Sequence, residues 1–168
     1  MKKVLLLIVV TASLVLFACS KDPFVAEQNT TNLSKTWFVK NQGSATNYSL
    51  FSTRPVTGRT FDSLDRVTSY YQMKDTLQAD DHNQLNPTFR ANFRIDLTTL
   101  NFGAGQYKNW NAADSVILKE GKIVIGGGRS KSGNTVDSIY FRLALKSAPN
   151  TDYIFSGHSR TGLLADEY

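Results

Sequence analysis

The stretch FRANFRIDL, residues 89–97, decides the fold. Its odd positions are all apolar, and its even positions, from Arg90 to Asp96, are all polar. A period of two is typical of a β-strand with one face in the core and the other in water. We therefore expect a β-sheet in which Phe93 and Ile95 point into the interior.

The same alternation recurs in residues 137–146, where Phe141 and Leu143 fall on one face. Residues 116–118 and 123–125 are predicted to form a hairpin around a turn at 119–122. A helix over 62–77 is an alternative to a strand over 67–73, and 78–87 is expected to be a long, mobile, polar loop. The remaining candidate strands are 36–41, 48–53 and 153–158.

About eight short strands, punctuated by Gly, Asn and Asp, favour an all-β domain. We predict a single antiparallel β-barrel of about eight strands, with a β-sandwich as the alternative. In a barrel, Phe93, Ile95, Phe141 and Leu143 would line one interior, and space left between such side chains would admit a small apolar ligand.

The N-terminus carries a targeting signal. Two lysines precede an apolar run over 4–17, which is too short to span a bilayer as a helix. Cys19 follows Leu-Phe-Ala, a sequence that resembles a bacterial lipobox. We predict a lipoprotein signal peptide at 1–18, a lipid on Cys19, a flexible tether over 19–33 and the barrel domain over 34–168. The alternative is an ordinary signal peptide with an incidental cysteine.

Composition excludes several classes of function. The net charge of +5 includes Lys2 and Lys3 of the signal, and no run of five basic residues occurs, so we expect no nucleic-acid partner. Cys19 is the only cysteine, so no disulfide or cysteine-based metal site is expected once it is acylated. We predict a monomer that is bound to the membrane through Cys19 and has no cofactor.

The candidate catalytic and metal motifs are weak. The run GGGRSKSG at 126–133 lacks the glycine that a phosphate loop needs directly before Lys-Ser, so a flexible connection between strands is expected. His82 follows Asp80 and Asp81, but no second histidine stands at metal-binding spacing. A Ser-His-Asp triad stays open because its members converge in space, although no Gly-x-Ser-x-Gly elbow is present. We assign no catalytic residue and no metal ligand.

Trp37 is a candidate structural residue. A tryptophan in the first strand of calycin-type barrels commonly closes one end of the barrel, with a cation packed over the ring. We predict that Arg160 supplies this cation, with Arg142 as the alternative. Lipocalins place glycine two residues before this tryptophan, where this chain has Lys35.

Four tripeptides share the form Asp, Ser or Thr, then an aliphatic residue, beginning at positions 62, 75, 114 and 137. One interpretation is strand initiation, because Asp and Ser satisfy local backbone groups. The other is a resemblance to the O-glycosylation sequon of exported Bacteroidetes proteins. That resemblance implies modification at Ser63 and Thr76.

Several segments carry a family resemblance: LSKTWFV (33–39), YSLFST (48–53), VDSIYF (136–141), YIFSGHSRTG (153–162) and DEY (166–168). Together they resemble a Bacteroidetes lipoprotein family described as lipid-binding and also as a hydrolase. The resemblance implies a calycin-like barrel with an apolar cavity. The expected function is a lipid-anchored cell-envelope protein that binds a lipid-like ligand. The alternatives are an esterase-like hydrolase and a non-catalytic surface scaffold. Ser20 after the cysteine favours the outer membrane, with surface exposure as a further option.

Overall fold

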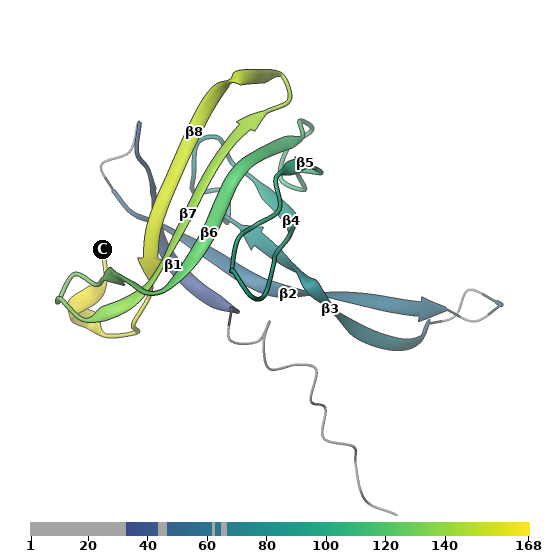
Figure 1. The fold of residues 1–168 in the computed structure, drawn as a ribbon, viewed down its shortest axis with the longest axis horizontal. Coiled ribbons are helices and arrows are strands. Elements are labelled where there is room, and N and C mark those ends of the chain that lie inside the picture. The colour runs from purple at the N-terminus through teal and green to yellow at the C-terminus, as the bar shows by residue number, and fades with distance from the viewer. Residues whose placement is uncertain (1–32, 44–46, 62, 65–66) are drawn as a thin grey trace, which may run out of the picture.

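The structure is a computed structural model that describes residues 33–43, 47–61, 63–64 and 67–168. Cys19, the predicted signal peptide and the predicted tether up to residue 32 lie outside these residues. None of the helical structure within the described ranges is long and apolar enough to cross a membrane. The described part folds into antiparallel strands and one short 3-10 helix (Figure 1). They are β1 (Lys35–Asn41), β2 (Ser49–Phe61), β3 (Val67–Asp80), β4 (Arg90–Arg94), β5 (Gly105–Tyr107), β6 (Val116–Arg129), β7 (Thr135–Leu145), β8 (Ala148–Ser159) and η1 (Leu164–Asp166).

The strands form one sheet in the order β4-β3-β2-β1-β8-β7-β6-β5. The segment that follows β4 nearly closes this sheet into a barrel. Ile95 bridges Phe102, Gly103 donates a backbone hydrogen bond to Arg94, and Phe102 donates one to Gly121 of β6. The prediction of an all-β antiparallel barrel is confirmed, and the sandwich alternative is wrong.

Phenylalanine rings fill the barrel interior. The alternation in residues 89–97 is confirmed, with Phe89, Ala91 and Phe93 fully buried. Phe141 contacts the rings of Phe93, Phe51, Phe89 and Phe102 at centroid distances of 5.1–6.2 Å. Rings at such distances in tilted arrangements are in direct packing contact.

The four predicted pocket residues belong to this core. Phe93, Phe141 and Leu143 are 0% exposed, and Ile95 is 3% exposed. Ile95 also borders a surface hollow of about 480 Å³ with Asp75 and Phe102. The structure thus places these side chains against one another within the packed interior.

The predicted hairpin with its turn at 119–122 is wrong, because these residues lie within strand β6. The strand runs unbroken from Val116 to Arg129 along β7, with register shifts next to Lys119 and before Gly128. Gly121 pairs with Phe141, and a Cβ at Gly121 would lie 3.0 Å from that ring. Glycine is therefore favoured here by the close approach of a core ring. The reversal of the chain comes later, at residues 130–134.

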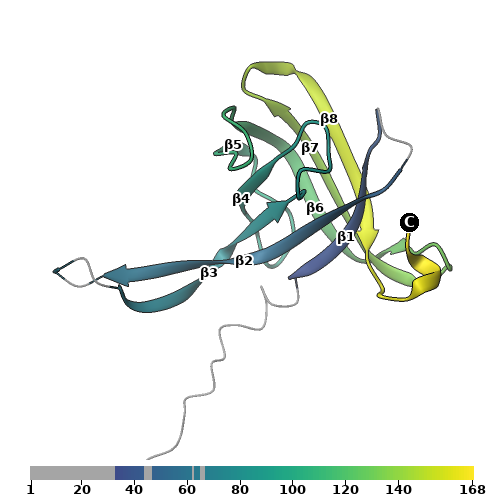
Figure 2. The ribbon, with the colours of Figure 1, turned by 180° about the vertical axis from the view of Figure 1, so that it is seen from behind.

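β2 and β3 form a hairpin that projects beyond the barrel (Figures 1 and 2). The helix alternative for residues 62–77 is wrong, because β3 continues from Val67 to Asp80. The predicted polar loop is correspondingly shorter, since 78–80 belong to β3. The fully buried carboxylate of Asp81 organises that loop, accepting hydrogen bonds from the backbone of Asn83 and Leu85 and from the Thr88 hydroxyl.

One end of the barrel, where β1 begins, carries an ion pair between Lys35 and Asp137. The same aspartate accepts a hydrogen bond from the Gly126 backbone at 2.8 Å. Burial opposes ionisation of Asp137, but the Lys35 and Gly126 hydrogen bonds prevail and lower the pKa of its carboxyl. Leu33, predicted as the last tether residue, is 3% exposed and joins the core. We call this the tether end of the barrel.

Candidate functional site

Strand alternation puts an aromatic pair on the outer face of the barrel. Phe38 of β1 and His158 of β8 are directly paired across the two strands. Trp37, next to Phe38, and Phe155, three residues before His158, point inward and are 0% exposed. Phe38 and His158 are nevertheless only 3% and 5% exposed, so another part of the chain must cover this outer surface.

The C-terminal segment supplies that cover. The Tyr168 ring packs on Phe38 at 5.0 Å, and its hydroxyl lies 3.1 Å from Nε2 of His158. Tyr48, which precedes β2, packs against Tyr168 in a tilted arrangement with a centroid distance of 4.3 Å. Desolvation by burial, with smaller contributions from Tyr48 and Asp166, raises the pKa of the Tyr168 hydroxyl.

Asp166 holds the C-terminal segment in place. It is 0% exposed and accepts hydrogen bonds from the Ser132 backbone at 2.6 Å and the Thr161 hydroxyl at 2.7 Å. Hydrogen bonds from Ser132, and then from Thr161, hold the pKa of this carboxyl well below its usual range. η1 is thereby fixed to the β6–β7 turn, and Tyr168 lies two residues after its last residue, Asp166.

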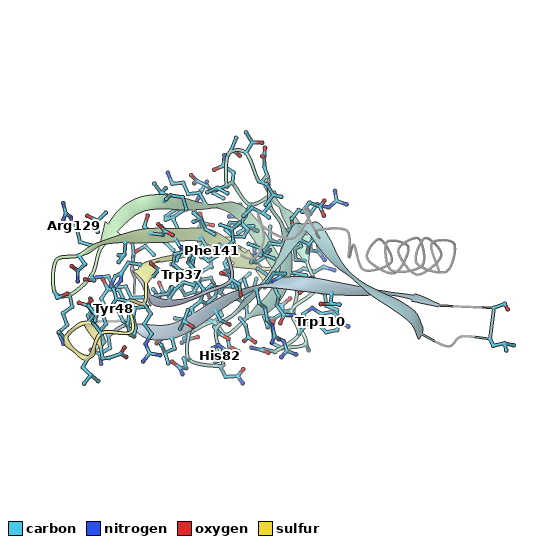
Figure 3. The ribbon with its side chains drawn as sticks, turned by 90° about the horizontal axis from the view of Figure 1, so that it is seen from below. Trp37, Tyr48, His82, Trp110, Arg129 and Phe141 are labelled. Carbon is cyan, nitrogen blue, oxygen red and sulfur yellow. The ribbon has the colours of Figure 1, made fainter. Side chains whose placement is uncertain are left out.

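These rings border a concave surface. An open hollow of about 530 Å³ is lined by Asn47, Tyr48, Lys131 and Tyr168. A second hollow of about 290 Å³ shares Tyr48 and extends past His158. We call the two hollows together the aromatic cleft. Figure 3 shows Tyr48 beside the C-terminal segment.

Cations lie over the rings of the aromatic cleft. Lys131 Nζ is 5.4 Å from the centroid of Tyr168, and Lys40 Nζ is 5.3 Å from that of Tyr48. Both distances are within the range of a cation–π contact. Lys131 also donates to the Glu167 backbone carbonyl at 2.8 Å, which is not an ion pair. The cleft therefore combines apolar ring surface with positive charge.

The residues of the aromatic cleft are arranged for ligand binding rather than for nucleophilic catalysis. His158 Nδ1 lies 3.2 Å from the Ser159 carbonyl, which requires Nδ1 to carry the proton. In a neutral imidazole with that tautomer, Nε2 accepts from the Tyr168 hydroxyl at 3.1 Å. Among the described residues, no serine hydroxyl hydrogen-bonds to His158, so the geometry of a Ser-His nucleophile is not assembled there.

Arg160 corrects the predicted contact with Trp37. Its guanidinium lies 5.9 Å from the Phe38 ring on the outer face, and its Nε donates to Glu167 at 2.7 Å. Trp37 points the opposite way, into the core, where its indole N–H donates to the Thr53 hydroxyl at 2.9 Å. Arg142, the alternative cation, pairs with Glu120 and Asp152 at the surface.

The other predicted positions are dispersed. Ser63 is exposed, but Thr76 is in β3, 8% exposed, with its hydroxyl 3.2 Å from the Asp75 carboxylate. The burial of Thr76 makes it a poor acceptor for a glycan. His82 lies 4.0 Å from Asp80 in the loop after β3, and no group of three metal-binding side chains was found within the described ranges.

Sequence reasoning missed Tyr48, Lys131 and Tyr168. Each comes from a different connection or terminus, so no local pattern links them. The alternation in β8 could have placed His158 on the outer face, because Phe155 is an odd number of residues away. A histidine on the outer face with a paired phenylalanine is a signal for an external aromatic site.

Comparison with curated proteins found no match. Comparison with protein families matched the chain to the model described as "Lipid-binding putative hydrolase", over residues 22–164. The match spans β1 to the first residue of η1 and thus covers nearly the whole barrel. The chain belongs to the family described as "Lipid-binding putative hydrolase".

Proposed function

We propose that this protein is a lipid-anchored protein of the cell envelope that binds a lipid-like, anionic amphiphile in the aromatic cleft. The observation that carries the proposal is the contact of the Tyr48 and Tyr168 rings, with Lys131 over the Tyr168 ring, beside a hollow of about 530 Å³. Hollows of about 300–1,000 Å³ are typical of sites for small ligands.

The chemistry of the cleft fits an amphiphile better than a purely apolar molecule. Ring faces of Tyr48 and Tyr168 contact hydrocarbon, while Lys131 and Lys40 attract an anionic group. The interior of the barrel is a poorer candidate, because Phe93 and Phe141 are fully buried in mutual contact.

The family description supports lipid binding and also mentions hydrolysis. Our proposal is limited to binding, because both ring nitrogens of His158 are already engaged. The anchor on Cys19, which lies outside the described residues, is supported by the lipobox resemblance. Ser20 after Cys19 supports the outer membrane as the location.

A matched pair of double variants tests the site. Titration with a fluorescent fatty acid should give saturable binding to the purified protein. Lys131→Ala with Tyr168→Ala should weaken that binding about tenfold, through loss of one cation–π contact and one ring surface. Lys108 and Trp110 form another cation–aromatic pair, at 3.9 Å, and their double alanine variant should bind as the wild type does.

Two outcomes would overturn the proposal. The first is a wild-type protein that neither binds the probe nor carries a co-purifying lipid in native mass spectrometry. The second is equal weakening by both double variants, which would indicate non-specific adsorption of the probe to surface aromatic residues.

A further inference from the structure

Several large apolar side chains are exposed at the tether end. Leu164 is 93% exposed, Ile125 is 63% exposed and Leu163 is 53% exposed. Single exposed apolar residues are common, but a group of them at one end of a domain marks an interaction surface.

A series of contacts links these residues at the same end of the barrel. Ile125 precedes Gly126, whose backbone donates to Asp137, and Asp137 pairs with Lys35. Lys35 lines a hollow of about 420 Å³ together with Gly162, directly before Leu163. In Figure 1, η1 and the β6–β7 turn lie side by side at the lower left of the barrel.

Cations without carboxylate partners border the apolar residues. Arg129 donates to the Gly133 carbonyl at 3.1 Å, and Lys131 donates to the Glu167 carbonyl. Neither forms an ion pair among the described residues, so both charges are available to phosphate. Lys35 and Arg160 are neutralised by Asp137 and Glu167.

The chain enters the barrel at this end. Leu33 is buried there, and 14 peptide units separate it from Cys19. A chain of that length reaches at most about 50 Å. A lipid on Cys19 would therefore hold the tether end nearer to the bilayer than the opposite end, where β7 finishes at Leu145.

We propose that the tether end is a membrane-contact face. Leu163, Leu164 and Ile125 enter the boundary between headgroups and acyl chains of an anionic bilayer, and Arg129 and Lys131 bind lipid phosphates. This inference rests on the anchor of the proposed function, and Lys131 is the one residue that it shares with the aromatic cleft. Contact of this kind would present the cleft, which shares Lys131, at the level of the lipid headgroups.

Fluorophore depth measurements on the processed, full protein test the face. When Cys19 is acylated, Leu164→Cys introduces the only free thiol, and Lys146→Cys does the same at the opposite end of the barrel. Each labelled protein is inserted through its anchor into phosphatidylglycerol vesicles that contain nitroxide lipids. The label at 164 should be quenched and lie about 5–10 Å below the headgroup surface, as for interfacial segments. The label at 146 should behave as in water.

The outcomes separate the face from the anchor. Equal, water-like behaviour of both labels on vesicle-bound protein would overturn the membrane-contact face and leave the anchor intact. Loss of both labelled proteins from the vesicles would overturn the anchor and, with it, this inference. In a second variant, Leu163→Glu with Leu164→Glu and a label at Ile125→Cys, quenching should fall although the protein stays bound. Unchanged quenching there would contradict the role of the two leucines.

Discussion

Gly157 lies where β8 approaches the backbone of β1 most closely. A Cβ at Gly157 would lie 2.0 Å from the Phe38 carbonyl oxygen, far inside van der Waals contact. Because backbone must move to make room, we expect Gly157→Ala to destabilise the fold by about 3 kcal/mol or more. Chemical denaturation measures this loss. Gly43→Ala, whose Cβ would meet Asn41 at an ordinary 3.7 Å, should be close to neutral.

Phe93 distinguishes a packed interior from a ligand cavity. Its ring contacts those of Phe89, Phe102, Tyr107 and Phe141 at 4.9–6.2 Å. Phe93→Ala should therefore cost about 3–5 kcal/mol of unfolding free energy. The fatty-acid titration should change little for the fraction that remains folded. A stable variant with altered probe affinity would instead place the ligand inside the barrel.

Ser63 is the accessible member of the two predicted glycosylation sites, at the tip of the β2–β3 hairpin. We expect protein from its native host to be heavier than the processed sequence, and Ser63→Ala to remove the excess mass. Thr76→Ala should leave the mass of the modification unchanged, because Thr76 is buried. An intact mass equal to that of the processed sequence would contradict glycosylation at both sites.

At the scale of elements, the alternating strands were predictable and the bulged one was not. Residues 89–97 and 137–146 alternate because each has a core-facing side, and that information is local. The alternation is interrupted in β6 at Glu120 and Gly121. The register shift beside Lys119 and the close approach of the Phe141 ring determine the path of the strand there. Both features involve the neighbouring strand β7 and cannot be read from the local sequence. Residues 119–122 were therefore predicted to form a turn.

Docking of the C-terminal segment depends on the charge of Asp166. Asp166→Asn should release η1 and Tyr168 from the outer face, weaken probe binding and leave global unfolding nearly unchanged. Hydrogen exchange at residues 161–168 would report the release. Asp96→Asn is a matched control, because Asp96 accepts backbone hydrogen bonds from Thr98 and Thr99 in a distant loop. Equal effects of the two variants on probe binding would contradict the anchoring role of Asp166.

The same carboxylate sets a pH dependence. The pKa of Asp166 in the folded protein is lower than its unfolded value of 3.8, so its stabilising effect is complete well above pH 3.8. The effect diminishes as the pH falls below 3.8 and is lost as the folded pKa is passed. Asp166 is therefore ionised at both pH 5 and pH 7, and its titration should cause no difference in probe binding between these two pH values.

At the scale of the whole molecule, the barrel was predictable and the site on its surface was not. The number of alternating segments and the scarcity of helical periodicity indicated an all-β barrel or sandwich, and the family resemblance favoured the barrel. Trp37 was correctly expected in the interior, but its cation partner was not, because the direction of Arg160 depends on how the chain turns after β8. The aromatic cleft joins a loop before β2, the β6–β7 turn and the C-terminus, which are brought together only by the complete fold.

Under the proposed function, lipidation of the protein depends on Cys19, because it is the only cysteine in the sequence. Each methylene of a bound acyl chain contributes about 0.8 kcal/mol to membrane binding, so two or three chains hold a protein firmly. Cys19→Ala should abolish processing at this position and yield either the uncleaved chain or protein released from the membrane. Fractionation with intact mass measures both results, and Ser20→Ala is the control for an unrelated disturbance of the signal. A Cys19→Ala protein that is processed and still remains in the membrane fraction would show that something other than a lipid on Cys19, such as the exposed Leu163 and Leu164, is sufficient for membrane attachment.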